Sequence, residues 1–447
     1  MSFAEIGLKV PSILFPAPEV DLRRWAVVAC DQYTSQPEYW QAVADDVGQS
    51  PSTLNLVFPE VYLEEPDGDD RVQAINRTMQ QYLDQGILRD LGEGFILLDR
   101  STSHAPSRRG LMVALDLEAY DFREGSGTLI RATEGTIVDR LPPRIRIRKD
   151  APIEVPHIMV LIDDPERTVI DPLATDPGEP LCDFPLMQNS GHLRAWQVKD
   201  PEKIAGVGRA LTALADPEGF AARYKVGPEH GVLLYAMGDG NHSLATAKAI
   251  WEDLKGREGA GAMDHPARFA LVELVNVHDA GIVFEPIHRV VFNTDGPQLL
   301  QDLVGHFTAG GMEAACHSCD DRAAADRLLA EKQGSGGHHM LWFSGADCGV
   351  LSVQNPRLTL ETGTLQSALD ACLEGKEGNS VDYIHGEDVV LSLSKEPGRL
   401  GFLLPVLSKN DLFRTVILDG ALPRKTFSMG EADEKRFYLE CRRIVPG

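Results

Sequence analysis

A buried strand, a glycine-rich turn and a helix follow one another directly in the middle of the chain. Val232 to Met237 is a continuous apolar run, which is typical of a strand buried on both faces. Apolar residues then recur at helical spacing from Ser243 to Leu254, which predicts an amphipathic helix. The turn between them reads Gly238-Asp239-Gly240-Asn241-His242. A strand that leads directly into a helix favours an architecture that mixes both kinds of element.

The residues of this turn are suited to binding a small anion. Its two glycines let the backbone adopt positive φ and let a ligand approach closely. The helix N-terminus, where Asn241 and Ser243 lie, offers unpaired N–H groups and the positive end of the helix dipole, which suits phosphate. Asp239 can hold a metal ion or accept a proton, and His242 can contact phosphate or act as an acid or base. The alternative is a plain tight turn with Asn241 as the N-cap and His242 on the surface.

The other patterns along the chain predict further strands and helices. Apolar runs predict strands at Trp25–Ala29, Phe95–Leu98, Leu111–Leu117, Leu129–Ile130, Ile145–Arg148, Ile158–Ile162, Phe269–Val277, Ile282–Phe284, Met340–Phe343, Val389–Leu393 and Phe402–Leu404. Helical spacing predicts helices at Val72–Gly86, Gln298–Phe307, Arg322–Glu331 and Gln366–Leu373. The pattern restarts beyond about residue 295, so we expect an N-terminal α/β lobe over residues 1–295 and a smaller C-terminal α/β lobe over residues 296–447. The expected fold class is α/β (mixed α+β), with mixed sheets and helices.

The charge balance narrows the possible partners. The chain of 447 residues has 43 Lys and Arg against 67 Asp and Glu, a net charge of −24. Nucleic acids and anionic lipids are bound through Lys and Arg, so we expect no nucleic-acid partner and no membrane partner. No stretch reaches the ~18 apolar residues of a membrane span. The start of the chain does not resemble a signal peptide, and seven scattered cysteines suit a reducing compartment. We therefore expect a cytoplasmic protein that binds a small anionic ligand or a nucleotide.

A second candidate site lies just past the strand predicted at Leu129–Ile130. Glu134 stands among hydroxyl and basic side chains, with Arg131 before it, Thr136 after it and Arg140 a little further along. A carboxylate in this position can deprotonate a substrate hydroxyl. The neighbouring arginines can bind a phosphate group through their guanidinium forks. The alternative is an exposed glutamate ahead of a turn.

A third segment alternates basic and apolar residues. Arg144, Arg146 and Arg148 are two positions apart, so on a strand they share one face. Three arginines on one face can bind an anionic group bidentately. The alternative is a solvated sheet face whose arginines pair with acidic residues elsewhere in the chain.

Two more basic segments can contribute to an anion site. His288 and Arg289 come directly after a predicted strand, where they can line the rim of a pocket. Arg424 and Lys425 lie near the end of the chain, in a segment that can contact phosphate. The plainer interpretations are a strand end at the surface for the first pair and a basic surface segment for the second.

The pattern Cys316-x-x-Cys319, with His338 and His339 downstream, has some of the residues of a zinc site. A structural zinc site usually has a second ligand pair at a set spacing, and the gap here is long and rich in glycine. We therefore expect no zinc.

Five short signatures occur in a fixed order along the chain. They are Ala29-Cys30-Asp31-Gln32-Tyr33, Ile130 to Thr136, Asp239-Gly240-Asn241-His242, Glu285-Pro286-Ile287-His288-Arg289 and Pro423-Arg424-Lys425-Thr426-Phe427. In this order they resemble the bacterial and archaeal family catalogued as domain of unknown function 1015. The family's central turn usually reads Asp-Gly-His-His-Arg, and its earlier motif reads His-Glu-x-Thr. Asn241 and Ser243 depart from the first and Thr133 from the second, so we expect a distinct branch of the family.

The family's central turn is also similar to that of the archaeal ADP-dependent free-serine kinases, which have a ParB/sulfiredoxin-like fold. This resemblance implies a ParB/sulfiredoxin-like element in the N-terminal lobe. It implies Glu134 as the base, and Asp239 and His242 as the residues that hold nucleotide phosphates or Mg²⁺. The arginine that the turn lacks is then to be supplied from elsewhere, by Arg140, Arg289 or Arg424.

Together these features predict a phosphotransferase. The expected activity is that of a nucleotide-dependent kinase acting on a small hydroxylated metabolite such as serine, with ADP or ATP and with Mg²⁺ held by Asp239. Two alternatives use the same site. One is a phosphatase of a phosphorylated amino acid, which needs no nucleotide, and the other is a non-catalytic regulator that binds an anionic metabolite.

Overall fold

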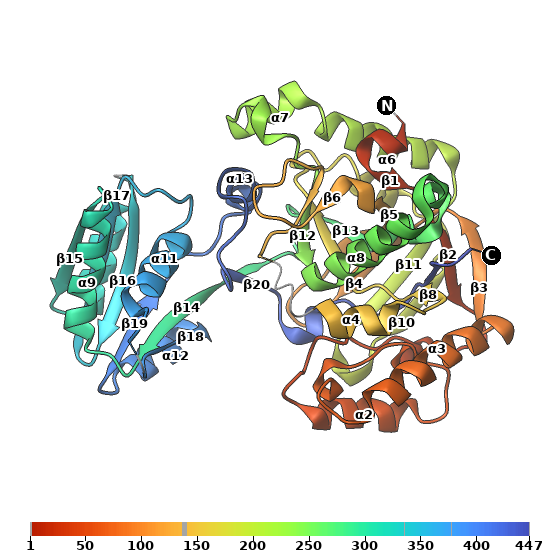
Figure 1. Cartoon of the computed structure of the whole chain (residues 1–447), viewed down its shortest axis with the longest axis horizontal. Coiled ribbons are helices and arrows are strands. Elements are labelled where there is room, and N and C mark those ends of the chain that lie inside the picture. The colour runs from red at the N-terminus through yellow and green to blue at the C-terminus, as the bar shows by residue number, and fades with distance from the viewer. Residues whose placement is uncertain (1, 136–140, 335, 377, 447) are drawn as a thin grey trace. The chain divides into compact units, whose positions relative to one another are not determined.

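The chain forms two compact units in the computed structural model, which describes residues 2–135, 141–334, 336–376 and 378–446. Unit 1 comprises Met1–Val283 together with Gly430–Gly447, and unit 2 comprises Phe284–Met429 (Figure 1). The boundary expected after residue 295 lies inside unit 2, because the strand that begins at Phe284 pairs with strands of that unit. The last residues of the chain belong to unit 1 and not to a C-terminal lobe.

A mixed sheet of ten strands forms the centre of unit 1 in the described residues. Along the strand Phe95–Ser101, neighbouring residues face two different apolar cores: Ile96 and Leu98 face one, and Phe95 and Leu97 face the other. The sheet is therefore covered on both sides, which explains its continuous apolar runs. Its strands run in the order β10 (Cys182–Pro185), β11 (His192–Val198), β4 (Phe95–Ser101), β5 (Arg108–Asp116), β13 (Phe269–Asn276), β9 (Met159–Ile162), β12 (Tyr235–Asp239), β7 (Ile130–Arg131) and β6 (Tyr120–Asp121), and β1 (Leu8–Lys9) pairs with β5.

Helices on the two faces supply the rest of these cores. Residues of α2 (Pro37–Val47) and α3 (Gly68–Asp84) belong to the core on one face. Residues of α6 (Pro201–Leu214) and α8 (Asn241–Glu258) belong to the core on the other. The shorter helices of unit 1 are α1 (Leu22–Trp25), α4 (Leu141–Arg148), α5 (Asp171–Thr175) and α7 (Pro217–Tyr224).

The last segment of the chain is built into unit 1 by backbone pairing with early segments. Strand β21 (Arg442–Arg443) pairs with β8 (Ile153–Glu154), and Phe437 forms an isolated bridge with Val28. A further two-stranded sheet joins β2 (Ser12–Pro16) and β3 (Leu88–Glu93). These pairings place residues from both ends of unit 1 beside the central sheet.

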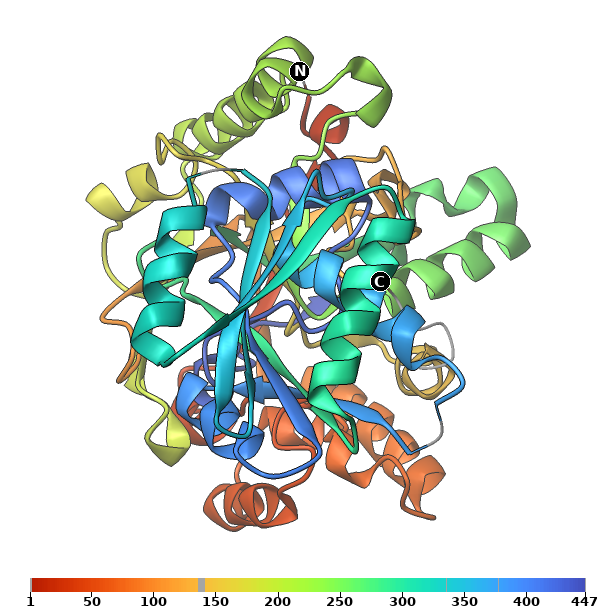
Figure 2. The same cartoon turned by 90° about the vertical axis from the view of Figure 1, so that its left-hand side faces the viewer.

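Unit 2 has its own sheet, with helices on both faces (Figure 2). The strand order is β15 (Glu313–Cys319), β17 (Asp347–Gln354), β16 (His338–Ser344), β19 (Arg399–Leu403), β14 (Phe284–Phe292) and β18 (Ser380–His385), and β20 (Phe427–Met429) pairs with the first residues of β14. Helices α9 (Gly296–Ala309) and α11 (Glu361–Leu373) pack on one face. Helices α10 (Arg322–Lys332) and α12 (Glu387–Ser394) pack on the other, and α13 (Lys409–Asp419) comes after β19.

The predicted mixed α/β class is confirmed, but three predicted strands are wrong. The segment Trp25–Ala29 ends a short helix and continues as extended chain, with one bridge at its fourth residue. The alternation at Ile145–Arg148 lies in α4, whose first turn contains two prolines, a position that suits proline. Val389–Leu393 lies in α12, where Val390 and Ser394 are buried four residues apart, the spacing of one helix face. Of the described helices, not one is long and apolar enough to span a membrane.

Candidate functional site

Two of the sequence motifs lie at the same end of two paired strands of unit 1. Strands β7 and β12 are parallel, with Arg131 opposite Ala236. Glu134 follows the first strand and Asp239 ends the second, each three residues beyond this pair. The Thr133 hydroxyl donates a hydrogen bond of 2.7 Å to the carbonyl oxygen of Met237, which ties the two segments together. The Glu134 segment is therefore brought alongside the turn that contains Asp239.

The turn requires a glycine at position 240. Gly240 has φ of +78°, in the left-handed region, and a Cβ atom added there would lie 3.1 Å from Cα of Ile158. It is also the N-cap of α8, and no side chain caps this helix. The side-chain oxygen of Asn241 is buried and has no hydrogen-bond partner in the described part of the chain. The first N–H groups of α8 are not capped by a side chain, and such N–H groups suit an anionic ligand.

Lysine 435, which was not predicted from the sequence, lies beside the turn. Its Nζ is 3.4 Å from Oδ2 of Asp239, and its side chain is only 15% exposed. The charge of Lys435 also acts on Asp31, another half-buried carboxylate. Burial raises the pKa of Asp31, but His157, a hydrogen bond from Gln32 and the charge of Lys435 outweigh this and lower that pKa overall. A single lysine therefore stabilises two carboxylates at this site.

His157 connects Asp31 with the start of α8. Its Nε2 is 2.9 Å from the hydroxyl oxygen of Ser243 and 3.6 Å from Oδ2 of Asp31. Its Nδ1 is 2.8 Å from the hydroxyl oxygen of Tyr438, which already accepts a hydrogen bond of 3.0 Å from the backbone N–H of Cys30. The hydroxyl group of Tyr438 can therefore donate its proton to Nδ1 of His157. The N–H proton of the neutral imidazole then lies on Nε2, facing Ser243 and Asp31. The ring is thus fixed on both sides.

A buried arginine holds the segment that supplies Lys435 and Tyr438. Nη1 of Arg436 lies 2.8 Å from Oε2 of Glu273 on β13, and its Nη2 pairs with Glu440. Its Nε donates a hydrogen bond of 2.9 Å to the carbonyl oxygen of Pro156, the residue before His157. Arg436 thus positions both sides of the site through contacts with the sheet.

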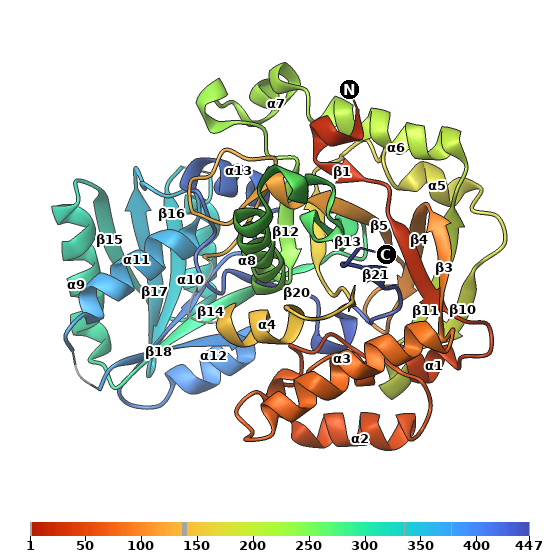
Figure 3. The ribbon, with the colours of Figure 1, turned by 45° about the vertical axis from the view of Figure 1, so that its right-hand side comes forward.

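A cavity opens beside His157 within unit 1. Its volume is about 130 Å³, so it is smaller than the pockets of about 300–1,000 Å³ that bind drug-sized ligands and has room only for a small molecule. Ser243 and Thr246 of α8 line one side, and residues of α4 line another; the two helices lie next to each other (Figure 3). The nearby thiol of Cys30 has a pKa raised by burial, so it stays protonated near neutral pH.

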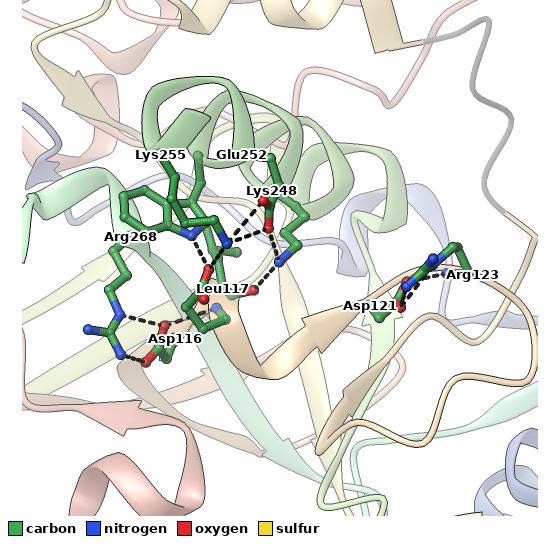
Figure 4. A network of polar contacts seen from close by, with 10 residues as sticks. Asp116, Leu117, Asp121, Arg123, Lys248, Glu252, Lys255 and Arg268 are labelled. Atoms are coloured by element: carbon green, nitrogen blue, oxygen red, sulfur yellow. Dashed lines mark hydrogen bonds and ion pairs between the residues drawn. The ribbon is translucent and has the colours of Figure 1, made fainter. Parts of the chain in front are cut away.

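A polar network fixes the far part of α8 (Figure 4). Nζ of Lys248 donates to the carbonyl oxygen of Leu117 at 2.8 Å, just after β5. The carboxylate of Glu118 accepts hydrogen bonds of 2.6 Å from both Trp251 and Lys255. The helix is thus held to the segment that follows β5, and its N-terminus comes directly after β12.

Several residues predicted for the site have other roles in unit 1. Arg131 is buried, and its guanidinium donates to the carbonyl oxygens of Thr128 and His230 at 2.8 and 2.7 Å. Burial lowers the pKa of Arg131 to about 10. The predicted residues Thr136 and Arg140 lie outside the described residues. The three alternating arginines of α4 do not share a strand face: each pairs with a different acid, Glu60, Asp69 or Glu154.

The remaining predicted residues belong to unit 2. Arg289 is fully buried and donates to the side chain of Gln366 at 2.9 Å and to backbone carbonyl oxygens, so its guanidinium is used within the fold. His288 accepts a hydrogen bond of 3.1 Å at Nδ1 from the backbone N–H of Leu404. Arg424 pairs with Asp370 at 3.1 Å, and Lys425 is exposed, with φ of +55°.

The candidate site offers few protein ligands for a metal ion. The described residues contain no cluster of three or more His, Cys, Asp or Glu side chains that can hold a metal ion. Mg²⁺ commonly uses one or two carboxylates together with water and phosphate oxygens. Asp239 suits that mode of binding.

Several solved structures match the chain at low sequence identity and low TM-score. A conserved hypothetical protein from Pyrococcus furiosus is 13% identical, with 73% of this chain and 90% of that chain covered and a TM-score of 0.32. A free serine kinase in complex with AMP is 11% identical, with 75% and 91% covered and a TM-score of 0.35. SbnI with a C-terminal truncation, from Staphylococcus aureus, is 11% identical, with 71% and 83% covered and a TM-score of 0.34.

No curated protein matches the sequence. Residues 12–372 match the family described as "Protein of unknown function (DUF1015)", which is most of the chain. The five signatures that suggested this family include the turn at the start of α8 and the segment that carries Asp31. The chain belongs to the DUF1015 family.

Proposed function

We propose that this protein is a phosphotransferase that transfers a phosphoryl group from an adenine nucleotide to a small hydroxylated metabolite. The observation that carries the proposal is the arrangement at the start of α8. An uncapped helix N-terminus, the carboxylate of Asp239 and the cation of Lys435 lie together there, and the Glu134 segment lies alongside. A phosphoryl transfer site needs an anion-binding backbone, a cation and a base in this proximity.

In this proposal each group has one task. The N–H groups at the start of α8 bind phosphate oxygens, and Lys435 offsets part of their negative charge. Asp239 holds Mg²⁺, which lowers the charge on the transferred group. Glu134 accepts the proton of the substrate hydroxyl as the new oxygen–phosphorus bond forms and the bond to the nucleotide breaks. His157 orients Ser243 at the edge of the phosphate site.

The test is a turnover assay with ATP or ADP, Mg²⁺ and a panel of hydroxylated acceptors that includes serine. We expect product formation that needs Mg²⁺. In Glu134→Gln kcat falls by about 10²–10⁴ while nucleotide affinity is kept, because only the base is lost. In Asp239→Asn the dependence on Mg²⁺ weakens.

Glu124→Gln and Asp253→Asn are the matched controls, because both side chains are exposed in unit 1. Both variants should retain wild-type turnover. Phosphate release from a phosphorylated amino acid without any nucleotide would replace this proposal with a phosphatase. Nucleotide binding with no turnover on any acceptor would replace it with a regulator.

A further inference from the structure

The cavity beside the phosphate site has a mainly apolar wall. Its lining includes Leu56, Phe58, Met79, Ile147 and Ile153, which come from four different segments of unit 1. Ser243, in the first turn of α8, is one of the residues that line the cavity. A molecule bound in it therefore has one end close to the proposed transfer site and its body among apolar side chains.

The charged groups of the lining are already paired with one another or with neighbours. Arg144 pairs with Glu60 across the cavity wall. Arg148 contacts Glu154 at 2.5 Å, and Glu154 also accepts a hydrogen bond of 2.6 Å from Arg442. Each acidic side chain of the lining thus has a basic partner, so no charged pair of the wall is arranged to receive the ammonium and carboxylate of a free amino acid.

Three polar side chains of the lining form one contiguous group. The ring of His157 contacts Ser243 and Tyr438, and all three residues line the cavity. With Nε2 protonated, the Ser243 hydroxyl accepts from His157 and keeps its own proton for a ligand oxygen. The cavity therefore offers one group of hydrogen-bonding side chains, two internally paired ion pairs and an otherwise apolar wall.

We propose that the cavity binds the body of a neutral alcohol, so that the phosphoryl acceptor is an aliphatic or aromatic alcohol and not a free amino acid. This inference rests on the proposed phosphotransferase function for its chemistry, but the binding itself can be measured alone. Ser243 and His157 hold the hydroxyl end, and the apolar wall takes the hydrocarbon.

Calorimetric titration of the full-length protein with a series of straight-chain primary alcohols, with benzyl alcohol and with serine tests this. Each added methylene should tighten binding about fourfold until the cavity is filled, the fold-change that corresponds to ~0.8 kcal/mol. Val155→Phe narrows the cavity at a half-buried position and should weaken binding at least tenfold. Val389→Phe, at an exposed position in unit 2, should change nothing.

An affinity that does not depend on chain length, or tighter binding of serine than of the alcohols, would overturn the inference. Phosphoryl transfer to serine without alcohol binding would contradict this inference and would support the proposed function. Alcohol binding that follows chain length, without phosphoryl transfer, keeps the cavity assignment and removes the proposed function.

A separate feature of unit 2 concerns two cysteines. Cys319 ends β15 and lies directly opposite Cys348 of the antiparallel strand β17. Sγ of Cys348 is 3.9 Å from the backbone oxygen of Cys319, and both side chains belong to the same apolar cluster. Directly opposed residues have Cα atoms about 4.5–5.5 Å apart, within the range of about 4.4–6.8 Å that a disulfide needs. Cys319 is partly exposed, so a reagent can reach it.

We infer that Cys319 and Cys348 form a reversible disulfide when a small disulfide oxidant is present. The Cys319 thiolate attacks the oxidant, a mixed disulfide forms and one oxidant thiol leaves. The Cys348 thiolate then attacks the Cys319 sulfur and the second oxidant thiol leaves, so two protein thiols are oxidised and one oxidant disulfide is reduced. The bond joins β15 to β17 and encloses α10 and β16 in a covalent loop.

Oxidation of the full chain with oxidised glutathione, followed by mass spectrometry of unreduced peptides, tests this. We expect one cross-link between Cys319 and Cys348, and a thermal midpoint several degrees above that of the reduced protein. Cys319→Ser should abolish both effects. Cys316→Ser, on the same strand but opposite Leu351, should retain them. Thiols at 319 and 348 that stay free, or a cross-link to any other cysteine, would contradict the inference.

Discussion

Nζ of Lys435 lies 3.4 Å from Oδ2 of Asp239, so a residue of the last segment of the chain neutralises the carboxylate at the start of α8. The two residues are almost 200 positions apart in the sequence. In the proposed function this lysine offsets part of the negative charge of the bound phosphate. Four predictions follow from this and other contacts of the described residues.

Lys435→Met should weaken nucleotide binding by about tenfold or more, because a charge-assisted contact with phosphate contributes about 1.5–3 kcal/mol. The methionine retains most of the side-chain length but removes the cation beside Asp239 and Asp31, so thermal stability should also decrease. Calorimetric titration with ATP and Mg²⁺ measures the effect. Lys199→Met, at an exposed position, is the control. Equal nucleotide affinities for the two variants would show that Lys435 does not contribute to nucleotide binding.

Gly240→Ala should destabilise the protein by about 1–3 kcal/mol, since a side chain at this φ is strained. The added Cβ would also lie 3.1 Å from Cα of Ile158. Gly256→Ala, further along the same helix, meets no atom within 4 Å and has no positive φ. That control should stabilise the protein by about 0.5–1 kcal/mol. Urea denaturation of both variants measures the two changes, and a neutral Gly240→Ala would show that the turn can rearrange.

His288 should make the stability of the protein depend on pH between about 6.5 and 4. Burial lowers the pKa of His288 to about 4, and its Nδ1 accepts a hydrogen bond from the backbone N–H of Leu404. The neutral ring is thus favoured in the folded state. As the pH falls below the ordinary value of about 6.5, the unfolded chain binds a proton that the folded one does not, so stability decreases until the pH reaches the folded pKa.

The measurement is the thermal midpoint of wild type and His288→Gln from pH 7.5 to 4. The wild-type midpoint should fall more steeply than that of the variant over this window. His104→Gln, at an exposed position, should follow the wild type. Parallel curves for wild type and His288→Gln would mean that folding does not lower the pKa of His288.

Arg436→Met should cost about 3–5 kcal/mol of stability, because it leaves buried carboxylates without their cation. The carboxylates concerned are those of Glu273 and Glu440. Arg257→Met, whose ion pair with Asp253 is exposed, should cost less than about 1 kcal/mol. Chemical denaturation gives both values. A small loss in Arg436→Met would indicate that the two glutamates take up protons when the arginine is absent.

Local patterns predicted the elements that are defined by nearby residues. The strand–turn–helix around Asp239 was predicted because its signals are local. The apolar run of β12 and the glycines of the turn lie within about a dozen consecutive residues. The alternation in α4 gave a wrong strand, because Arg144 and Arg146 pair with acids that are distant in the sequence, Glu60 and Asp69. Such partners leave no local signal.

The site residues that were missed share one property: tertiary folding alone brings them to the turn. His157 precedes a predicted strand but shows no motif of its own, and Lys435 and Tyr438 lie in a segment that returns to unit 1 after the whole of unit 2. Asp31 was part of a family signature, and this was the one hint that the start of the chain takes part in the site.

The pairing of β14 with β20 gives unit 2 the character of an insertion. Phe284 is opposite Met429, so the chain leaves unit 1 and comes back to it through two adjacent strands. Replacing residues 284–429 with a short turn should therefore leave a continuous unit 1 with its final strand in place. A fragment that simply stops before residue 284 lacks Lys435, Arg436 and Tyr438, and with them both the cation of the site and part of the core around the central sheet.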